Sequence, residues 1–209
     1  MSKRAGAVPE ETREGILQAA KNEFSEYGFQ GSSLRRICAA AGVTTGALYF
    51  FFQGKNDLFE TVISGVTVPF MNYMKQHYDE EKQCISKEVP TDNGDGDFQI
   101  SHVLIDFYFK NQLTWDIVLK HQEHPSVRKF IDTFVDVSAE HYTYIFRMAE
   151  KIQKKDYPVD SFAIRQFANM QTDTMLRLIS NNFTQQEMTE HSHVVVKMLR
   201  GAFHALLSD

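Results

Sequence analysis

Apolar residues recur every three or four positions along most of the chain, which is the spacing of one face of an α-helix. No long segment alternates apolar and polar residues as a half-buried strand does. Pro125, Pro158 and the pair Asn181-Asn182 interrupt the periodic segments of the second half. The helices expected there span residues 98–108, 110–123, 126–154, 159–180 and 184–207. The pattern therefore predicts an all-α protein of about nine helices.

The first half of the chain has shorter periodic segments and one long one. An apolar stripe from Ile16 to Tyr27 ends at Gly28, which predicts a first helix. A long helix is expected to open at Lys55 and to run to Lys82, with a bend at Pro69. The segment 86–97 is polar, acidic and rich in glycine, so it is expected to be a mobile surface loop.

Residues 32–57 form the most informative stretch, because they read as two short helices joined by a tight turn. Ser32 is expected to cap the first of these, whose apolar face is Leu34, Ile37, Cys38 and Ala41. Gly42 follows at once and can adopt the positive φ that stops a helix. Thr44 or Thr45 is expected to cap the second helix. This is the helix-turn-helix pattern.

The stretch from Ile16 to Val62 resembles the TetR family of transcriptional repressors. The segments that show this resemblance are ILQAAKNEFSEYGF and SSLRRICAAAGVTTGALYFFFQGKNDL. The resemblance implies a three-helix DNA-binding domain at residues 1–60 and a larger helical bundle at 61–209 that binds a ligand and dimerises. It also implies DNA contacts, mostly to phosphates, from Ser33, Thr44, Thr45, Gly46, Tyr49 and Lys55.

Charge supports DNA contact through its distribution, although the whole chain carries −5. No acidic residue lies between Tyr27 and Asn56, whereas Arg35, Arg36 and Lys55 do. Such a surface does not repel phosphates, and Arg35 is therefore added to the expected contacts. Phe50, like Ala47, offers an apolar contact to a thymine methyl group.

The middle of the chain is rich in aromatic residues, and several have polar tips. Such side chains suit a cavity that holds a mostly apolar ligand, although the same rings can simply fill a core. The family resemblance favours a cavity for a small apolar or aromatic effector. The candidate lining residues are Phe70, Met74, Phe109, Trp115, His121, Tyr142 and Phe146.

Residues 159–207 are expected to form two helices with more apolar surface than one partner helix needs. By family resemblance, two such helices from each chain form a four-helix interface of a homodimer. Purely internal packing is the alternative. The candidate interface residues are Phe167, Met175, Val195, Leu199 and Phe203. A helix-turn-helix reader also needs a dimer to span two half-sites.

Patterns of catalysis and metal binding are missing from the sequence. It has no nucleophile elbow, no Gly-rich phosphate loop and no HExxH motif, so no enzyme and no cofactor is predicted. His121 and His124 have a spacing that suits metal ligands, but a place at a helix end before Pro125 accounts for them more simply. Cys38 and Cys84 give no disulfide framework, and no metal site is predicted.

No apolar run approaches the roughly 18 residues that span a bilayer, and no secretory signal is visible, so a cytoplasmic location without membrane attachment is expected. The sequence thus predicts a homodimeric repressor of the TetR type that leaves its double-stranded operator when a small molecule binds in the bundle. The alternative is a DNA-bound structural or cell-division factor that answers to a protein partner and needs no ligand cavity.

Overall fold

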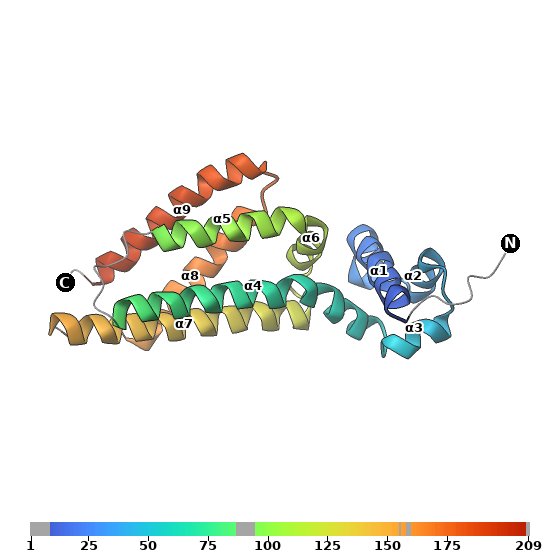
Figure 1. The fold of residues 1–209 in the computed structure, drawn as a ribbon, viewed down its shortest axis with the longest axis horizontal. Coiled ribbons are helices and arrows are strands. Elements are labelled where there is room, and N and C mark those ends of the chain that lie inside the picture. Colours follow the sequence, from blue (N-terminus) through green and yellow to red (C-terminus); the bar gives the residue numbers. More distant parts are fainter. Residues whose placement is uncertain (1–8, 87–94, 155, 158–159, 208–209) are drawn as a thin grey trace. The chain divides into compact units, whose positions relative to one another are not determined.

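The computed structural model describes residues 9–86, 95–154, 156–157 and 160–207. Within these residues the fold is all-α, as predicted, and contains nine helices (Figure 1). They are α1 (Pro9–Gly31), α2 (Leu34–Ala41), α3 (Thr45–Phe51), α4 (Lys55–Ser86), α5 (Asp95–Lys110), α6 (Gln112–Lys120), α7 (Pro125–Gln153), α8 (Ser161–Ile179) and α9 (Gln185–Leu206). The expected loop at 86–97 reached too far, since α5 already begins at Asp95; residues 87–94 lie outside the described part.

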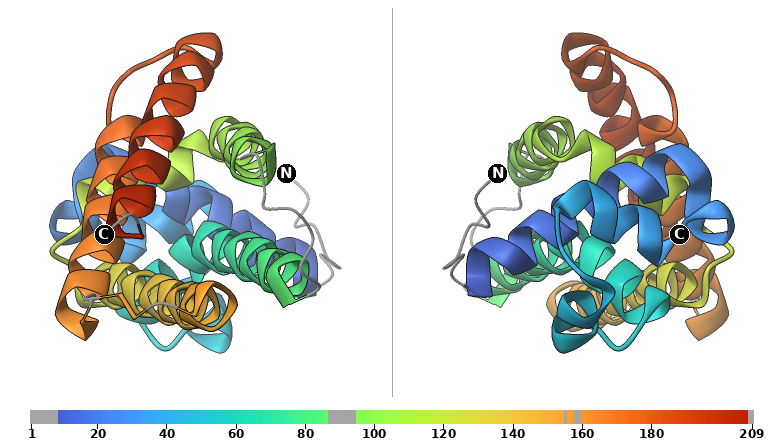
Figure 2. Two further views of the ribbon diagram at one scale, coloured as in Figure 1. Left: turned by 90° about the vertical axis from the view of Figure 1, so that its left-hand side faces the viewer. Right: turned by 90° about the vertical axis from the view of Figure 1, so that its right-hand side faces the viewer.

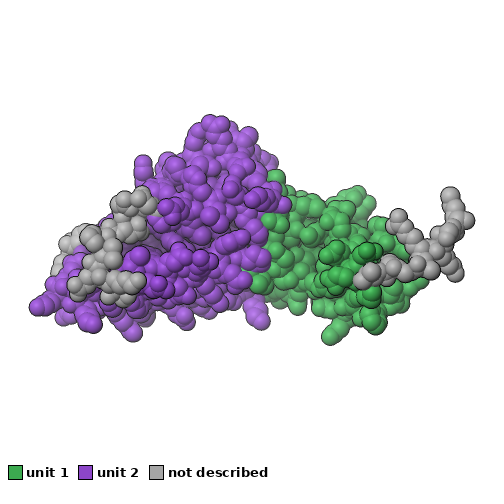
Figure 3. Space-filling model, in the orientation of Figure 1, with its two compact units in different colours: residues 1–68, 111–127 green, residues 69–110, 128–209 purple. Residues whose placement is uncertain are grey.

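The helices form two compact units (Figure 3). Unit 1 comprises Met1–Val68 and Asn111–Val127, and unit 2 comprises Pro69–Lys110 and Arg128–Asp209. The predicted division at residue 60 thus differs from these units, because residues 61–68 and the segment containing α6 group with the N-terminal helices. The reason lies in α6, which packs against α1.

Unit 1 is held by a core of apolar side chains from its helices. Ile16, Phe24, Ile37, Leu48 and Phe59 have no exposed surface. The rings of Phe24 and Phe59 meet edge to face with centroids 5.2 Å apart, a favourable arrangement for aromatic pairs. Burial of these side chains, at about 1.5–3 kcal/mol for each, fixes how the short helices α2 and α3 lie on α1.

Local sequence sets the ends of α2 and α3. Gly42 has φ 68° and ψ 28° and ends α2, as predicted, and its N–H and that of Val43 bond to the last carbonyls of the helix. The Thr44 side chain caps α3 by accepting the Ala47 N–H at 3.2 Å. The predicted cap of α2 was wrong by one residue. Ser33 holds the cap position, while the Ser32 hydroxyl donates to the Phe29 carbonyl at 2.7 Å.

Helix α4 begins at Lys55, as predicted, and continues through Pro69 to Ser86, beyond the expected end at Lys82. Its first part belongs to unit 1 and its second part to unit 2. Among the described residues, no helix is long and apolar enough to cross a lipid bilayer.

Unit 2 is built from the second part of α4 together with α5, α7, α8 and α9. Helices α5 and α9 run side by side, and α8 also packs on α9 (Figure 2). One core cluster consists of Met74, Tyr78 and Phe134. A second group of rings is formed by Tyr142, Phe146, Phe167 and Phe203. Two clusters of large side chains thus fill this bundle.

Candidate nucleic-acid interface

Helix α3 divides its side chains between the core and the solvent. Leu48 is fully buried, whereas Tyr49 is 59% and Phe50 is 79% exposed. Thr45 and Gly46 at the start of the helix are also exposed. The two exposed rings contribute little burial to the folded protein, so this face of α3 is suited to contact another molecule.

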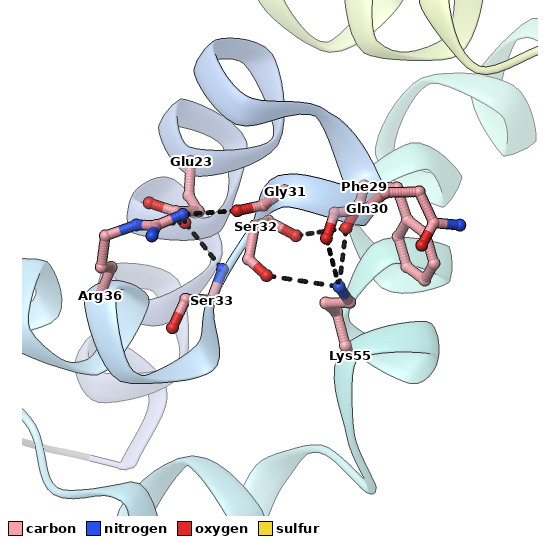
Figure 4. Close-up of polar contacts among 8 residues, drawn as sticks. All are labelled: Glu23, Phe29, Gln30, Gly31, Ser32, Ser33, Arg36 and Lys55. Atoms are coloured by element: carbon pink, nitrogen blue, oxygen red, sulfur yellow. Dashed lines mark hydrogen bonds and ion pairs between the residues drawn. The ribbon is translucent and has the colours of Figure 1, made fainter.

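Beside this face, α2 carries Arg35 and Arg36, and the two have different surroundings. Arg35 is exposed and has no partner among the described residues. Arg36 donates from Nε to Glu23 Oε1 at 2.8 Å and from Nη2 to the Gly31 carbonyl at 2.6 Å (Figure 4). The hydrogen bond to Glu23 raises the pKa of Arg36. Arg36 therefore holds the protein together, and Arg35 remains available to an external anion.

Glu23 is the centre of the contacts that join α1 to α2. It is only 8% exposed, and its Oε1 atom accepts both the Arg36 Nε–H and the Ser33 N–H, the latter at 2.8 Å. Ser33 begins α2, where backbone N–H groups lack helical partners. The carboxylate thus fixes the start of the helix-turn-helix segment to the middle of α1.

Lys55 has a different environment from the one that the sequence suggested. Its Nζ donates to the carbonyls of Phe29, Gln30 and Ser32 at 2.8, 3.3 and 3.3 Å (Figure 4). The ammonium also lies 4.7 Å from the centroid of the Phe29 ring. A lysine has three N–H donors, and these contacts use all of them. Lys55 thus ties the end of α1 to the start of α4.

Helix α6 is attached to the same end of α1. The backbone N–H of Phe29 donates to His121 Nε2 at 2.9 Å, and the His121 Nδ1 atom lies 2.7 Å from the Ile117 carbonyl. Since Nε2 accepts, the Nδ1–H donates to the Ile117 carbonyl. Gly28 has φ 68°, and a Cβ atom there would lie 3.3 Å from His121 Nε2. Both conformation and space therefore require glycine at this contact.

The His124 ring packs edge-on against Phe29, at a centroid distance of 4.6 Å, and lies 4.4 Å from Phe59. Burial lowers the pKa of His124, and His121 lowers it further. As the pH falls, His124 is therefore protonated at a higher pH in the unfolded chain than in the folded protein. The stability that the neutral ring confers is present above pH 6.5, the ordinary value, and is lost as the pH falls through 6.5 towards the folded pKa.

We accordingly expect the free energy of unfolding to fall between about pH 7.5 and about pH 5.5, and to fall less in a His124→Phe variant, which keeps an aromatic ring. Urea unfolding curves at the two pH values measure both differences. An equal loss in the parent and the variant would show that His124 is not the titrating group.

The predicted ligand-lining residues divide between the two units. Phe70 and Met74 belong to the core cluster around Tyr78 and Phe134. The residues Tyr142 and Phe146 lie in the second ring cluster, and Phe109 contacts Tyr108. Trp115 and His121 lie on or beside α6, in unit 1.

Sequence reasoning missed His141 and Gln171, whose side chains point into unit 2. The available signal was a polar residue on an otherwise apolar helix face, since Ser138 and His141 share the buried side of α7 with Phe134 and Ile145. Buried polar groups need partners, so a polar residue within an apolar stripe indicates a polar contact inside the fold.

The predicted dimer residues are largely turned inward. Phe167 is 6% exposed, Met175 packs against the core cluster, and Phe203 lies among the rings of Tyr142 and Phe146. Val195 and Leu199 are half-buried. The large apolar side chains of α8 and α9 that are exposed are Phe162 at 69%, Met170 at 43%, Val194 at 56% and Met198 at 66%.

Residues 16–62 match the model of a family described as bacterial regulatory proteins, tetR family. The transcriptional repressor BepR of Brucella suis is 43% identical over 74 residues, which are 35% of this chain and 35% of BepR. The regulator AcrR of Shigella flexneri is 42% identical over 62 residues, which are 30% of this chain and 29% of AcrR. The matched segments thus span about a third of the length of these curated relatives.

Similar folds extend over the rest of the chain. SmeT, the repressor of the Stenotrophomonas maltophilia multidrug efflux pump SmeDEF, has a TM-score of 0.66 at 20% identity, over 92% of this chain and 91% of SmeT. A TetR-like transcriptional regulator from Rhodococcus sp. RHA1 has a TM-score of 0.63 at 14% identity, over 99% of this chain and 100% of that one. Similarity at these identities concerns the fold.

Proposed function

This chain belongs to the TetR family of bacterial regulatory proteins through residues 16–62, and we propose that it is a homodimeric repressor that binds operator DNA and leaves it when a small molecule binds in unit 2. The observation that carries the DNA part is the exposed face of α3. It joins two exposed rings, Tyr49 and Phe50, to an unpaired Arg35 on α2, in a stretch of sequence without an acidic residue.

Each exposed residue has its own role in this proposal. Arg35 and Tyr49 contact phosphates, which position the protein on the duplex. Thr45 and Gly46 approach the bases at the start of α3, and the Phe50 ring lies against a thymine methyl group. Ser33 and Thr44 act mainly through the helix starts that they form. Lys55 acts indirectly, by holding α1 and α4 in place.

The remaining parts of the proposal concern unit 2 and the location of the protein. Dimerisation through α8 and α9 places two copies of α3 in successive major grooves, about 34–36 Å apart. Ligand binding favours a state with a different separation, which lowers DNA affinity. The curated relatives are transcription regulators, which supports a non-enzymatic, cytoplasmic role. A partner-regulated DNA-bound factor is the alternative, and ligand binding in unit 2 separates the two.

Selection of duplexes from a random pool by the purified protein tests the function. We expect enrichment of sites with two inverted half-sites whose centres are about one helical turn apart. Recovery of only non-specific duplexes would argue against sequence-specific regulation.

A selected duplex then allows the two cationic residues to be compared. Arg35→Ala is expected to weaken binding and to reduce the slope of log K against log salt by about two units for a dimer, because one phosphate contact is lost from each protomer. Lys55→Met, which keeps the aliphatic stem, should leave the slope unchanged. Salt titrations of the parent and both variants measure this. A similar reduction of the slope in Lys55→Met would show that Lys55 contacts a phosphate.

A further inference from the structure

The interior of unit 2 contains a cluster of polar side chains from three helices. Tyr78 of α4 and Ser138 of α7 share a hydrogen bond of 2.9 Å between their hydroxyl oxygens. The imidazole of His141 is stacked on the Tyr78 ring, with centroids 4.0 Å apart and planes 11° apart. The side chain of Gln171 of α8 lies near the Tyr78 hydroxyl, whose pKa it lowers. All three side chains thus lie at Tyr78, within unit 2.

Two atoms of this group are buried and have no hydrogen-bond partner in the described residues: His141 Nδ1 and Gln171 Oε1. His141 is only 1% exposed. A buried polar atom without a partner is destabilising, so such atoms are rare in folded proteins. A bound molecule that supplies the missing partners would remove that destabilisation.

The chemistry of the missing partner follows from the other bonds of the two side chains. His141 Nε2 lies 2.8 Å from Glu81 Oε2, so the Nε2–H donates to the carboxylate, and in the tautomer protonated at Nε2 the Nδ1 atom presents a lone pair. Gln171 lowers the pKa of Tyr78, as an amide N–H directed towards the hydroxyl does, and its buried atom without a partner is the carbonyl oxygen. Both unpartnered atoms are therefore acceptors, and the molecule that fits them must be a donor.

Apolar side chains and two carboxylates lie around these polar side chains. Met74, Phe134, Phe70 and Met175 pack around Tyr78, and methionine side chains adapt readily to a guest. Burial raises the pKa of the Tyr78 hydroxyl, and although the Ser138 and Gln171 side chains act in the opposite direction, the Glu81 and Asp97 carboxylates raise it further. Asp97 is already paired with Arg200 at 2.8 Å and His77 at 3.3 Å, whereas the bonded partner of Glu81 is His141.

We infer that the effector in the proposed function is an apolar amine, whose ammonium group donates to His141 Nδ1 and Gln171 Oε1 while its hydrocarbon or aromatic body packs against Tyr78, Phe134 and Met74. This inference rests on the proposed ligand-responsive function. An ammonium has enough N–H groups for both acceptors and is attracted by Glu81, and aromatic faces stabilise cations. A hydroxyl can donate to only one acceptor. A carboxylate would face two acceptors and a second carboxylate.

Three probes with one common body test this chemistry on the full chain: 4-phenylbutylamine, 4-phenylbutan-1-ol and 4-phenylbutyrate. We expect calorimetric titration to give the amine an affinity about tenfold or more above that of the alcohol, and the carboxylate the lowest affinity. Failure of the amine to bind, or equal affinity of the amine and the carboxylate, would overturn the inference.

Variants locate the site. Gln171→Met removes one acceptor with little change of volume, and we expect it to lower amine affinity about tenfold while changing alcohol affinity less. His141→Phe keeps a ring on Tyr78 and should do the same. Gln166→Met, at an exposed position of α8, is the matched control and should bind like the parent. Unchanged amine affinity in Gln171→Met and in a folded His141→Phe would contradict the site.

Stabilisation by the amine distinguishes a binding role of Gln171 from a purely structural one. The amine should raise the unfolding temperature of the parent and of Gln166→Met, but not that of Gln171→Met. DNA binding is measured separately, without any probe. If the protein binds the amine but no specific duplex, the amine site stands and the proposed function is contradicted. If it binds a specific duplex but does not select the amine, the amine site is contradicted and the DNA-binding function stands.

Discussion

Met198→Asp is expected to convert the proposed dimer into monomers. Met198 is 66% exposed and Val194, one turn earlier on α9, is 56% exposed, so the two form an apolar surface that a second copy would cover. An aspartate there would bury an unpaired charge in the interface. We expect the dissociation constant of the dimer to rise at least about a hundredfold, which corresponds to roughly 3 kcal/mol. Sedimentation equilibrium at micromolar concentration measures it.

The same change should have a second consequence, because a monomer contacts only one half-site. Affinity for a duplex with two half-sites should fall to that for a single half-site. Lys197→Asp places the same side chain at an exposed polar position of α9 and should leave the dimer intact. If the parent is itself a monomer at micromolar concentration, or if Met198→Asp dimerises as the parent does, α9 does not form the interface through this face.

Glu23→Ala is expected to destabilise unit 1 by about 3 kcal/mol. It removes the acceptor of both the Ser33 N–H and the Arg36 guanidinium, from a position that is 8% exposed. The segment before α2 then loses its attachment to α1, so DNA affinity should fall as well. Denaturant unfolding monitored by circular dichroism gives the free-energy difference.

Glu23→Gln is the matched control, since its amide oxygen can still accept from both donors. It should lose much less stability than Glu23→Ala, although the charge is gone. A double-mutant cycle with Arg36→Ala isolates the ion pair from the Ser33 contact. Equal stability of the Ala and Gln variants would mean that the hydrogen bonds of Glu23 do not hold this segment.

Much of the fold follows from local chemistry and is therefore visible in the sequence. Gly42 ends α2 because a left-handed backbone favours glycine, and Thr44 caps α3 because its hydroxyl reaches an N–H three residues on. Apolar periodicity gave the helices of the second half to within a few residues. Phe50, predicted to contact a thymine methyl group, is 79% exposed in the structure.

Contacts between residues far apart in sequence determined the features of the fold that the sequence did not predict. Lys55 was expected to contact a phosphate because sequence alone does not reveal that three carbonyls at the end of α1 lie within reach of its ammonium. His121 likewise bonds to Phe29, 92 residues away, and α6 joins unit 1 as a result. Neither partner leaves a local signal, since a carbonyl or an N–H is present in almost every residue.

The apolar stripes of α8 and α9 show the same division. Their composition determined by itself that two amphipathic helices form, because helix periodicity depends on neighbours along the chain. Which side of each stripe faces inward was decided by Tyr142 and Phe146 of α7, whose rings enclose Phe203 and leave Met198 in solvent. His141 acquires its unpaired nitrogen in the same way, because only the packing of α7 against α4 removes it from water while Glu81 takes its other nitrogen.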